Sequence, residues 1–270
     1  MLFLTRFFLT LLIGALLGVS AGARAGETIH LRVAELPDKR HVYYTKLLEE
    51  SLAALGYKVR YTFVKDVSQP RIWKMVESDQ LSFIWGVQTK NRDAEYAFAV
   101  NSLTNGLIGQ RLMLIPKGQE QAYAKVNSLE DLRRLDKMGS VGINWLEAEL
   151  WAINRLPVYT KSGDWRELFP MVRSGARGID YVVRGANEIT IEAAHYGLAV
   201  EPRLMLTYDR DMRYYLSPAT ARYKALFEKA LAQADRSGLK KELIARYIGQ
   251  DLKGLNLDKR VRLKLAMPPS

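Results

Sequence analysis

"LSFIWGVQTKNRDAEYAF", residues 81–98, is a short apolar run of strand character followed by a polar segment that contains Thr89 and Arg92. An arginine directly after a buried strand is usually solvated. It can also bind a carboxylate, because its planar guanidinium offers two parallel donors. Which of the two roles Arg92 has depends on the strands and helices around this segment.

Strands and helices alternate around residues 81–98. On the amino-terminal side the patterning predicts, in order, a strand at 30–34, a helix at 41–55, a strand at 57–64, a helix at 70–77 and a strand at 81–86. Gly56 provides the stop signal of the first helix. This order predicts parallel strand pairing with helices on the faces of the sheet.

A second alternating series follows "PKG" at residues 116–118. It predicts a helix that begins at 128–132, a strand at 140–143, a helix at 146–153, a strand at 158–160, a helix at 165–172, a strand at 179–183 and a helix at 188–195. Extended segments at 107–115 and 203–216 flank this series, and helices at 219–234 and 239–248 follow. We therefore expect two α/β lobes, joined by two crossing segments, with the ligand cleft between them.

The expected boundaries follow from this pattern. They are a signal peptide at 1–25, a discontinuous lobe 1 at 26–113 plus 210–270, and an inserted lobe 2 at 114–209. The signal peptide is predicted from one early charge at Arg6, an apolar run of about 13 residues and a small-x-small end at Ala23 and Ala25. The run is short for a membrane span, which needs about 20 residues, although an uncleaved anchor is the alternative. We expect a periplasmic protein that begins at Gly26.

Composition narrows the possible functions. The chain has no cysteine, which excludes disulfides, thiolate metal sites, a cysteine nucleophile and a lipid-modified cysteine. The net charge is +11, and removal of Arg6 and Arg24 leaves 38 − 29 = +9. Basic and acidic residues are interleaved, so we expect no nucleic-acid partner, whereas attraction to anionic ligands or headgroups stays open. The basic run Lys253–Lys264 is expected to be a solvated tail.

Seven motifs occur in one order along residues 27–250. They are the strand and loop at 31–37, Gly56-Tyr57, "TKNRDAEYAF", "PKG" with "VNSLEDL", "GSVGI", "RGIDYVV", and the closing helices from "SPATARYKALF" to "ELIARYIG". In this order they resemble the bacterial extracellular solute-binding proteins of the amino-acid type, family 3, and the chain is identified as a divergent member. The resemblance implies the type II periplasmic binding protein fold.

The resemblance also implies ligand-binding residues. "TKNR" matches the Thr-x-x-Arg of the family, so Thr89 and Arg92 stand where the arginine grips the carboxylate of an amino acid. The alternative is that Arg92 pairs with Asp93 or Glu95 outside the cleft. Glu35 and Tyr44 follow the first strand, at the sheet edge where ligands bind in open α/β folds. For Tyr44, packing of its helix is the alternative.

The chain departs from the family pattern at several of these positions. Trp85 stands where small hydroxyl residues are usual, and Asn144 and Trp145 replace a Gly-Thr or Gly-Ser pair. Arg184 follows the "RGIDYVV"-like strand, where the resemblance implies an aspartate that receives the ligand's ammonium. Glu188 either takes over that role or is a favourable acid in the first turn of a helix. Arg92, Arg184, Trp85 and Trp145 together would favour a ligand with anionic and flat apolar parts.

The sequence contains few signatures of catalysis. The three histidines have no zinc-ligand spacing, and neither a Gly-x-Ser-x-Gly motif nor a phosphate-binding loop is present in the sequence. We expect no catalytic residue, no metal and no cofactor. The alternative is an enzyme on the same fold that uses paired carboxylates, such as Glu147 with Glu149 or Glu35 across the cleft from Glu188, for proton transfer.

The main hypothesis is a monomeric periplasmic protein that captures a small polar or anionic, amino-acid-like solute. Its partner would be an inner-membrane ABC permease or a sensor.

Overall fold

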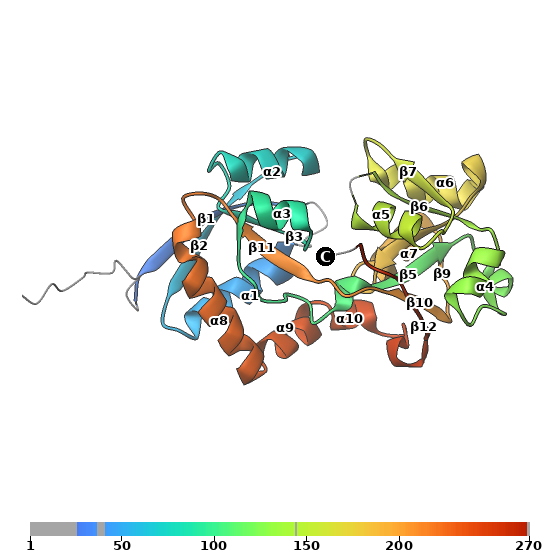
Figure 1. Ribbon diagram of the computed structural model, residues 1–270. Coiled ribbons are helices and arrows are strands. Elements are labelled where there is room, and N and C mark those ends of the chain that lie inside the picture. The colour runs from blue at the N-terminus through green and yellow to red at the C-terminus, as the bar shows by residue number, and fades with distance from the viewer. Residues whose placement is uncertain (1–25, 37–40, 144, 269–270) are drawn as a thin grey trace, which may run out of the picture.

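The computed structural model describes residues 26–36, 41–143 and 145–268. They form two α/β lobes that lie side by side and are joined by crossing segments (Figure 1). No helix in the described part of the chain is both long and apolar enough to cross a membrane.

The first lobe contains two small sheets and five helices among the described residues. β1 (Thr28–Ala34) pairs in parallel with β2 (Lys58–Val64), and β11 (Met212–Leu216) lies between β3 (Phe83–Val87) and β4 (Ala97–Phe98), antiparallel to both. The helices are α1 (His41–Ala53), α2 (Gln69–Glu77), α3 (Lys90–Glu95), α8 (Lys224–Ser237) and α9 (Leu239–Tyr247). The expected parallel pairing therefore holds for β1 and β2. β3 instead pairs antiparallel with β11, the strand that returns from the second lobe.

The second lobe is built on one mixed sheet with the strand order β12-β10-β5-β8-β6-β7, and β9 pairs with β5. The strands are β5 (Gln110–Ile115), β6 (Met138–Gly142), β7 (Val158–Lys161), β8 (Ile179–Gly185), β9 (Ala199–Val200), β10 (Leu204–Thr207) and β12 (Val261–Lys264). The helices are α4 (Leu129–Arg134), α5 (Leu146–Ile153), α6 (Leu168–Ser174), α7 (Ile189–Tyr196) and α10 (Gly249–Leu252). Short 3-10 turns lie at Leu107–Gly109, Glu120–Tyr123, Trp165–Glu167, Ala176–Gly178, Ala221–Tyr223 and Leu257–Lys259.

Local signals explain several of these elements. Ser128 caps α4 by accepting a hydrogen bond from the Asp131 N–H at 3.1 Å, as the capping pattern predicts. Gly56 has a φ of 86°, a conformation that favours glycine after a helix. Separate buried cores support the two lobes. One includes Leu47, Phe83 and Tyr214, and another includes Trp151 and Tyr181.

The carboxyl-terminal segment differs from the expectation. Residues 253–264 are not a solvated tail, and β12 pairs in parallel with β10 in the sheet of the second lobe. Leu263 is buried in that lobe while Arg262 and Lys264 face solvent, so the strand alternates. Arg260 anchors the segment, because its guanidinium donates to the carbonyl oxygens of residues 201, 204 and 255. The segment therefore belongs with the second lobe, whereas the remaining expected boundaries stay predictions.

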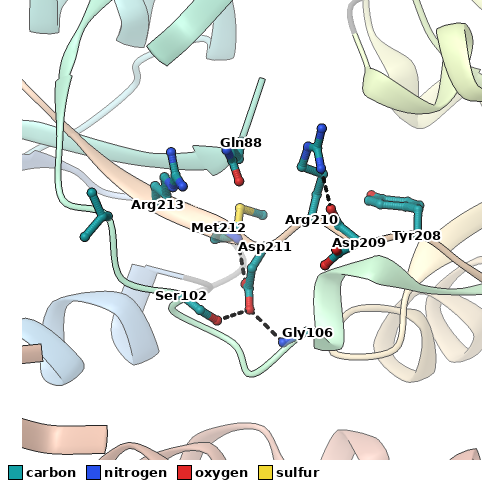
Figure 2. A pocket seen from close by; sticks show the side chains of 10 residues that line it. Gln88, Ser102, Gly106, Tyr208, Asp209, Arg210, Asp211, Met212 and Arg213 are labelled. Atoms are coloured by element: carbon teal, nitrogen blue, oxygen red, sulfur yellow. Dashed lines mark hydrogen bonds between the residues drawn. The ribbon is translucent and has the colours of Figure 1, made fainter. Parts of the chain in front are cut away.

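The two crossing segments are tied together at Asp211. Its carboxylate accepts hydrogen bonds from the Ser102 hydroxyl, from the Thr104 N–H at 3.1 Å and hydroxyl at 2.5 Å, and from the Gly106 N–H at 2.6 Å (Figure 2). These bonds join the loop that leaves the first lobe to the strand that returns to it. The Asp211 hub therefore fixes the route of both segments between the lobes.

A glycine allows the closest approach of the same segments. A Cβ on Gly109 would overlap the carbonyl oxygen of Tyr208 and lie 3.0 Å from that of Arg210. Gly109 also accepts a hydrogen bond from the Tyr208 N–H at 3.1 Å. Any side chain at this position would have to push backbone against backbone.

Candidate functional site

Arg92 lies in the first turns of α3, directly beyond β3. The Thr89 hydroxyl caps this helix by accepting a hydrogen bond from the Arg92 N–H at 3.3 Å. The guanidinium donates to the Val87 carbonyl oxygen at 2.6 Å and lies over the ring of Trp73, 4.9 Å from its centroid. It is half-buried, and no carboxylate of the described residues lies within ion-pair distance of it. The strand end, the cap and the aromatic ring together fix its orientation.

The alternative in which Arg92 pairs with Asp93 or Glu95 is not what the structure shows. Asp93 instead accepts hydrogen bonds from Arg213 and Tyr215, each at 2.9 Å. Arg92 also lies within electrostatic reach of the second lobe. Burial lowers the pKa of Arg92, and Tyr215, Glu147 and Tyr96 partly offset this. Whether Arg92 holds a ligand stays a prediction.

Aromatic residues of the first lobe stack near the same strand end. Tyr44 is buried and its ring stacks on that of Trp85, with centroids 4.6 Å apart and planes at 16°. The Tyr44 carbonyl oxygen accepts a hydrogen bond from the Tyr214 hydroxyl at 2.6 Å. Tyr44 therefore packs α1 onto the core, which agrees with the packing alternative. Its ring also covers one side of the half-buried Trp85 ring. Glu35 lies just after β1, where its N–H donates to the Val64 carbonyl oxygen at 2.9 Å.

Arg184 does not offer its charge to the cleft as the sequence analysis expects. It is only 4% exposed, and its guanidinium binds Glu192 through two hydrogen bonds of 2.5 and 2.8 Å. A third contact joins it to Glu188 at 3.0 Å. The rings of Trp145 and Trp165 lie over it, with centroids at 5.0 and 4.6 Å. Arg184 is thus enclosed by carboxylates and indoles of its own lobe, because α7 and the residue before it bring the two glutamates back to the strand end.

The same contacts change the interpretation of Glu188 and Trp145. Glu188 is an ion-pair partner of Arg184, and a second arginine, Arg111, lies 3.7 Å from it. Trp145 also packs on Gly142, where a Cβ would lie 2.7 Å from the indole nitrogen. These contacts of both residues are therefore with other residues of the second lobe, near the end of its sheet. Asn144, the remaining residue of the expected site, lies outside the described residues.

Arg111 is a site residue that the sequence analysis does not identify. It lies on β5 and is 5% exposed. Its guanidinium forms an ion pair with Glu147 and donates to the Tyr208 hydroxyl at 3.1 Å, and that hydroxyl donates to Glu147 at 2.5 Å. Burial opposes the charge of Arg111, but Glu147, Tyr208 and Glu188 outweigh it and raise the pKa of the guanidinium above its usual range. Arg111 therefore remains charged inside the lobe.

We call Arg111, Glu147, Arg184, Glu188 and Glu192 the ionic cluster. Its members come from β5, α5, β8, the residue that precedes α7, and α7 itself. They meet at the edge of the sheet where β8 ends and where the crossing segment at Tyr208 leaves the lobe. Two of the four acids that were candidates for proton transfer are thus bound to arginines: Glu147 to Arg111, and Glu188 to Arg184.

A cavity of about 350 Å³ lies against the crossing segments between the lobes. It is lined by Gln88, Val100, Ser102, Gly106 and residues 208–213. Figure 2 shows Arg210 and Gln88 on one side of the crossing strand and the Asp211 carboxylate on the other. Gln88 directly precedes Thr89, so the cavity borders the segment that carries Arg92. Among the described residues, no group of three or more His, Asp or Glu side chains is placed to hold a metal ion.

Solved structures of two-lobed binding proteins are similar to this chain. One is the probable amino-acid ABC transporter extracellular-binding protein YtmK of Bacillus subtilis, with 12% identity, a TM-score of 0.61, and 83% of this chain and 99% of that chain covered. A second comes from a study of glutathione import via GshT and the cystine ABC importer TcyBC of Streptococcus mutans, with 15% identity, a TM-score of 0.58, and coverage of 83% and 95%. A third is an ancestral arginine-binding protein bound to glutamine, with 15% identity, a TM-score of 0.57, and coverage of 84% and 100%.

No protein-family model matches the sequence, and no protein with a curated description matches it. At these low identities the similarity shows the fold. The chain has the two-lobed fold of the amino-acid-type solute-binding proteins, as the sequence predicts.

Proposed function

We propose that this protein is an exported solute-binding protein that closes its two lobes over a small carboxylate-bearing molecule. The fold supports this, because its similar structures include binding proteins described with amino-acid ligands or ABC importers. The observation that carries the proposal is Arg92. It is a half-buried guanidinium, oriented by a helix cap and a carbonyl oxygen, and it lies within ion-pair distance of no carboxylate in the described ranges.

In the proposed mechanism the two lobes close on the ligand from opposite sides. The first lobe would bind the ligand carboxylate at Arg92, and Trp85 would supply a flat apolar surface beside it. The second lobe would close on the crossing segments that the Asp211 hub and Gly109 bring together, as in other hinge-bending binding proteins. Closure excludes water and strengthens the charge-assisted hydrogen bonds to the guanidinium.

The test is binding by the Arg92→Ala variant. Native mass spectrometry of the purified protein first identifies any retained small molecule, and calorimetry then measures its affinity. Since each charge-assisted hydrogen bond contributes about 1.5–3 kcal/mol, Arg92→Ala should weaken binding about tenfold to a hundredfold or more. Arg92→Lys should recover only part of this loss, because it keeps the charge without the planar fork.

Thermal unfolding without ligand is the control. Arg92 has one backbone acceptor and one aromatic neighbour, so its loss should change the melting temperature of the empty protein little. Normal ligand affinity of Arg92→Ala would refute the carboxylate clamp. A large loss of stability in the empty protein would mean that the arginine is structural.

Export and the partner are part of the same proposal. The mature protein should begin at Gly26 and be released by osmotic shock, which amino-terminal sequencing of the released fraction checks. The membrane partner would be an ABC permease or a sensor. Co-purification with the membrane fraction and an intact Met1 would contradict export by a cleaved signal.

A further inference from the structure

The plane of the Arg92 guanidinium is set by more than its hydrogen bond. The bond to the Val87 carbonyl oxygen, at 2.6 Å, holds one nitrogen and leaves the plane free to turn about it. The ring of Trp73 supplies a second contact, because the guanidinium carbon lies over it, 4.9 Å from the centroid. A cation over an indole face is attracted by the quadrupole of the ring, and a planar guanidinium can also stack on it. The carbonyl oxygen and the aromatic face together define both a position and a plane.

Trp73 is itself held in place. It is half-buried on α2, and its ring contacts the rings of Tyr96 and Tyr215, with centroids 5.1 and 5.6 Å away. Both tyrosines are fixed by their hydroxyls, which donate to the carboxylates of Glu77 and Asp93 respectively. The indole therefore cannot turn away from the guanidinium without displacing two anchored rings.

A glycine in β3 makes room for the indole. Gly86 is buried, and a Cβ built on it would lie 3.0 Å from two carbon atoms of the Trp73 ring and 3.6 Å from the Tyr215 ring. Glycine weakens the interior of a strand and often marks a position where another group approaches closely. Here the approaching group is the ring on which the guanidinium lies, so the indole contacts both β3 and Arg92.

The acid next to Arg92 does not orient it. Asp93 accepts hydrogen bonds from Arg213 and Tyr215, each at 2.9 Å, and from Gln88 at 3.2 Å. These three donors hold the Asp93 carboxylate away from the neighbouring guanidinium. The orienting group is therefore the indole rather than a carboxylate.

From these contacts we propose that Trp73 is a positioning residue of the Arg92 carboxylate clamp. It sets the plane in which Arg92 presents its two parallel donors, and Gly86 is the position that admits it. The inference rests on the proposed solute-binding function and adds to it a residue that does not touch the ligand. A guanidinium that turns freely keeps its charge but loses the preorganised fork, so the affinity for a carboxylate falls.

Arginine reactivity in the ligand-free protein is the first test. Phenylglyoxal modifies guanidiniums, and mass spectrometry of the peptide that contains Arg92 measures the rate at that residue. Trp73→Leu should raise this rate several-fold, because it removes the group that covers and holds the guanidinium. Ile72→Ala is the matched control, since it loosens the buried side of the same helix, and it should leave the rate unchanged. An unchanged rate in Trp73→Leu, or equal rates in both variants, would overturn the inference.

Affinity is the second test. The probes are L-glutamine, L-glutamate and L-arginine, because they share an α-carboxylate and differ in side-chain charge. Calorimetry with the probe that the unchanged protein binds most tightly should show a loss of about threefold to thirtyfold in Trp73→Leu. Trp73→Phe keeps an aromatic face and should lose less. In the Arg92→Ala background, Trp73→Leu should alter the affinity by less than about twofold.

The double variant separates positioning from direct contact. An effect of Trp73→Leu that persists without Arg92 would mean that the indole touches the probe, and would overturn the positioning role. Gly86→Ala covers the case in which Trp73→Leu does not fold. It keeps the indole and displaces its ring, so it should also raise the phenylglyoxal rate at Arg92, and an unchanged rate would overturn the inference.

The inference and the proposed function fail in different ways. If Arg92→Ala weakens probe binding and Trp73→Leu does not, the inference is wrong and the proposed function stands. If Arg92→Ala binds the probes as tightly as the unchanged protein, the carboxylate clamp itself is wrong. If none of the three probes binds, the phenylglyoxal rates alone decide whether Trp73 positions Arg92.

Discussion

Replacement of Asp211 by alanine should destabilise the junction between the lobes. The carboxylate accepts hydrogen bonds from the N–H groups of Thr104, Gly106 and Met212 and from the hydroxyls of Ser102 and Thr104. The hydroxyls can turn to solvent when the carboxylate is removed. The three N–H groups are fixed by the backbone and would lose this acceptor.

The magnitude follows from those three N–H groups. A donor left without an acceptor costs about 1–3 kcal/mol, and the site borders the cavity, so water compensates in part. We take the lower end, about 1 kcal/mol for each, or about 3 kcal/mol in total. For a protein of this size, 1 kcal/mol corresponds to about 2–4 °C in melting temperature, so the expected decrease is about 6–12 °C.

Differential scanning fluorimetry of the ligand-free protein measures this decrease. Asp209→Ala is the matched control, because Asp209 is exposed and two residues away on the same segment. It should change the melting temperature by less than about 2 °C. If Asp211→Ala melts within about 2 °C of the parent protein, or no lower than the control, the Asp211 hub does not stabilise the junction.

Three further outcomes are expected. Gly109→Ala should lower the melting temperature by about 2–12 °C, the equivalent of about 1–3 kcal/mol of overpacking, because its Cβ would overlap a carbonyl oxygen. Gly249→Ala is the control and should not lower it, because the nearest atom to its Cβ would be 3.9 Å away. Equal melting temperatures of the two variants would contradict the steric argument. Burial raises the pKa of Glu201, so its contribution to stability is lost as pH rises from about 4.5. Glu201→Gln should therefore gain melting temperature relative to the parent as the pH rises above about 4.5, and a difference that does not change with pH would count against this. Small-angle scattering should show a smaller radius of gyration with saturating ligand, and no change with a ligand proven to bind would exclude lobe closure.

The sequence predicted most elements because their signals are local. The expected helix at 146–153 coincides with α5, and the expected cap at Ser128 is formed. Apolar periodicity, a capping hydroxyl and a stopping glycine act within a few residues of each other, so the chain alone reveals them. The carboxyl-terminal strand was missed because its charged residues dominate a short alternating segment. Its pairing with β10 depends on residues more than fifty positions away.

The candidate site was predictable in position but only partly in chemistry. Arg92 does lie just beyond β3 with Thr89 as its helix cap, and Arg184 does stand near the end of β8. Arg111 was a missed signal, since an arginine inside the apolar run "QRLMLI" implies a buried partner. That partner, Glu147, comes from a helix of another part of the chain.

By itself the sequence determined the alternation of strands and helices, hence the two-lobed fold, and the residue types at the strand ends. The tertiary structure alone decided which of the strand-end charges have carboxylate partners among the described residues. Arg92 and Arg184 look equivalent in sequence, yet α7 and two tryptophans enclose one of them, and the other has a carbonyl oxygen as its acceptor. The reason is that an ion pair costs or gains free energy according to burial and to partners from distant segments, and neither is written in the local pattern.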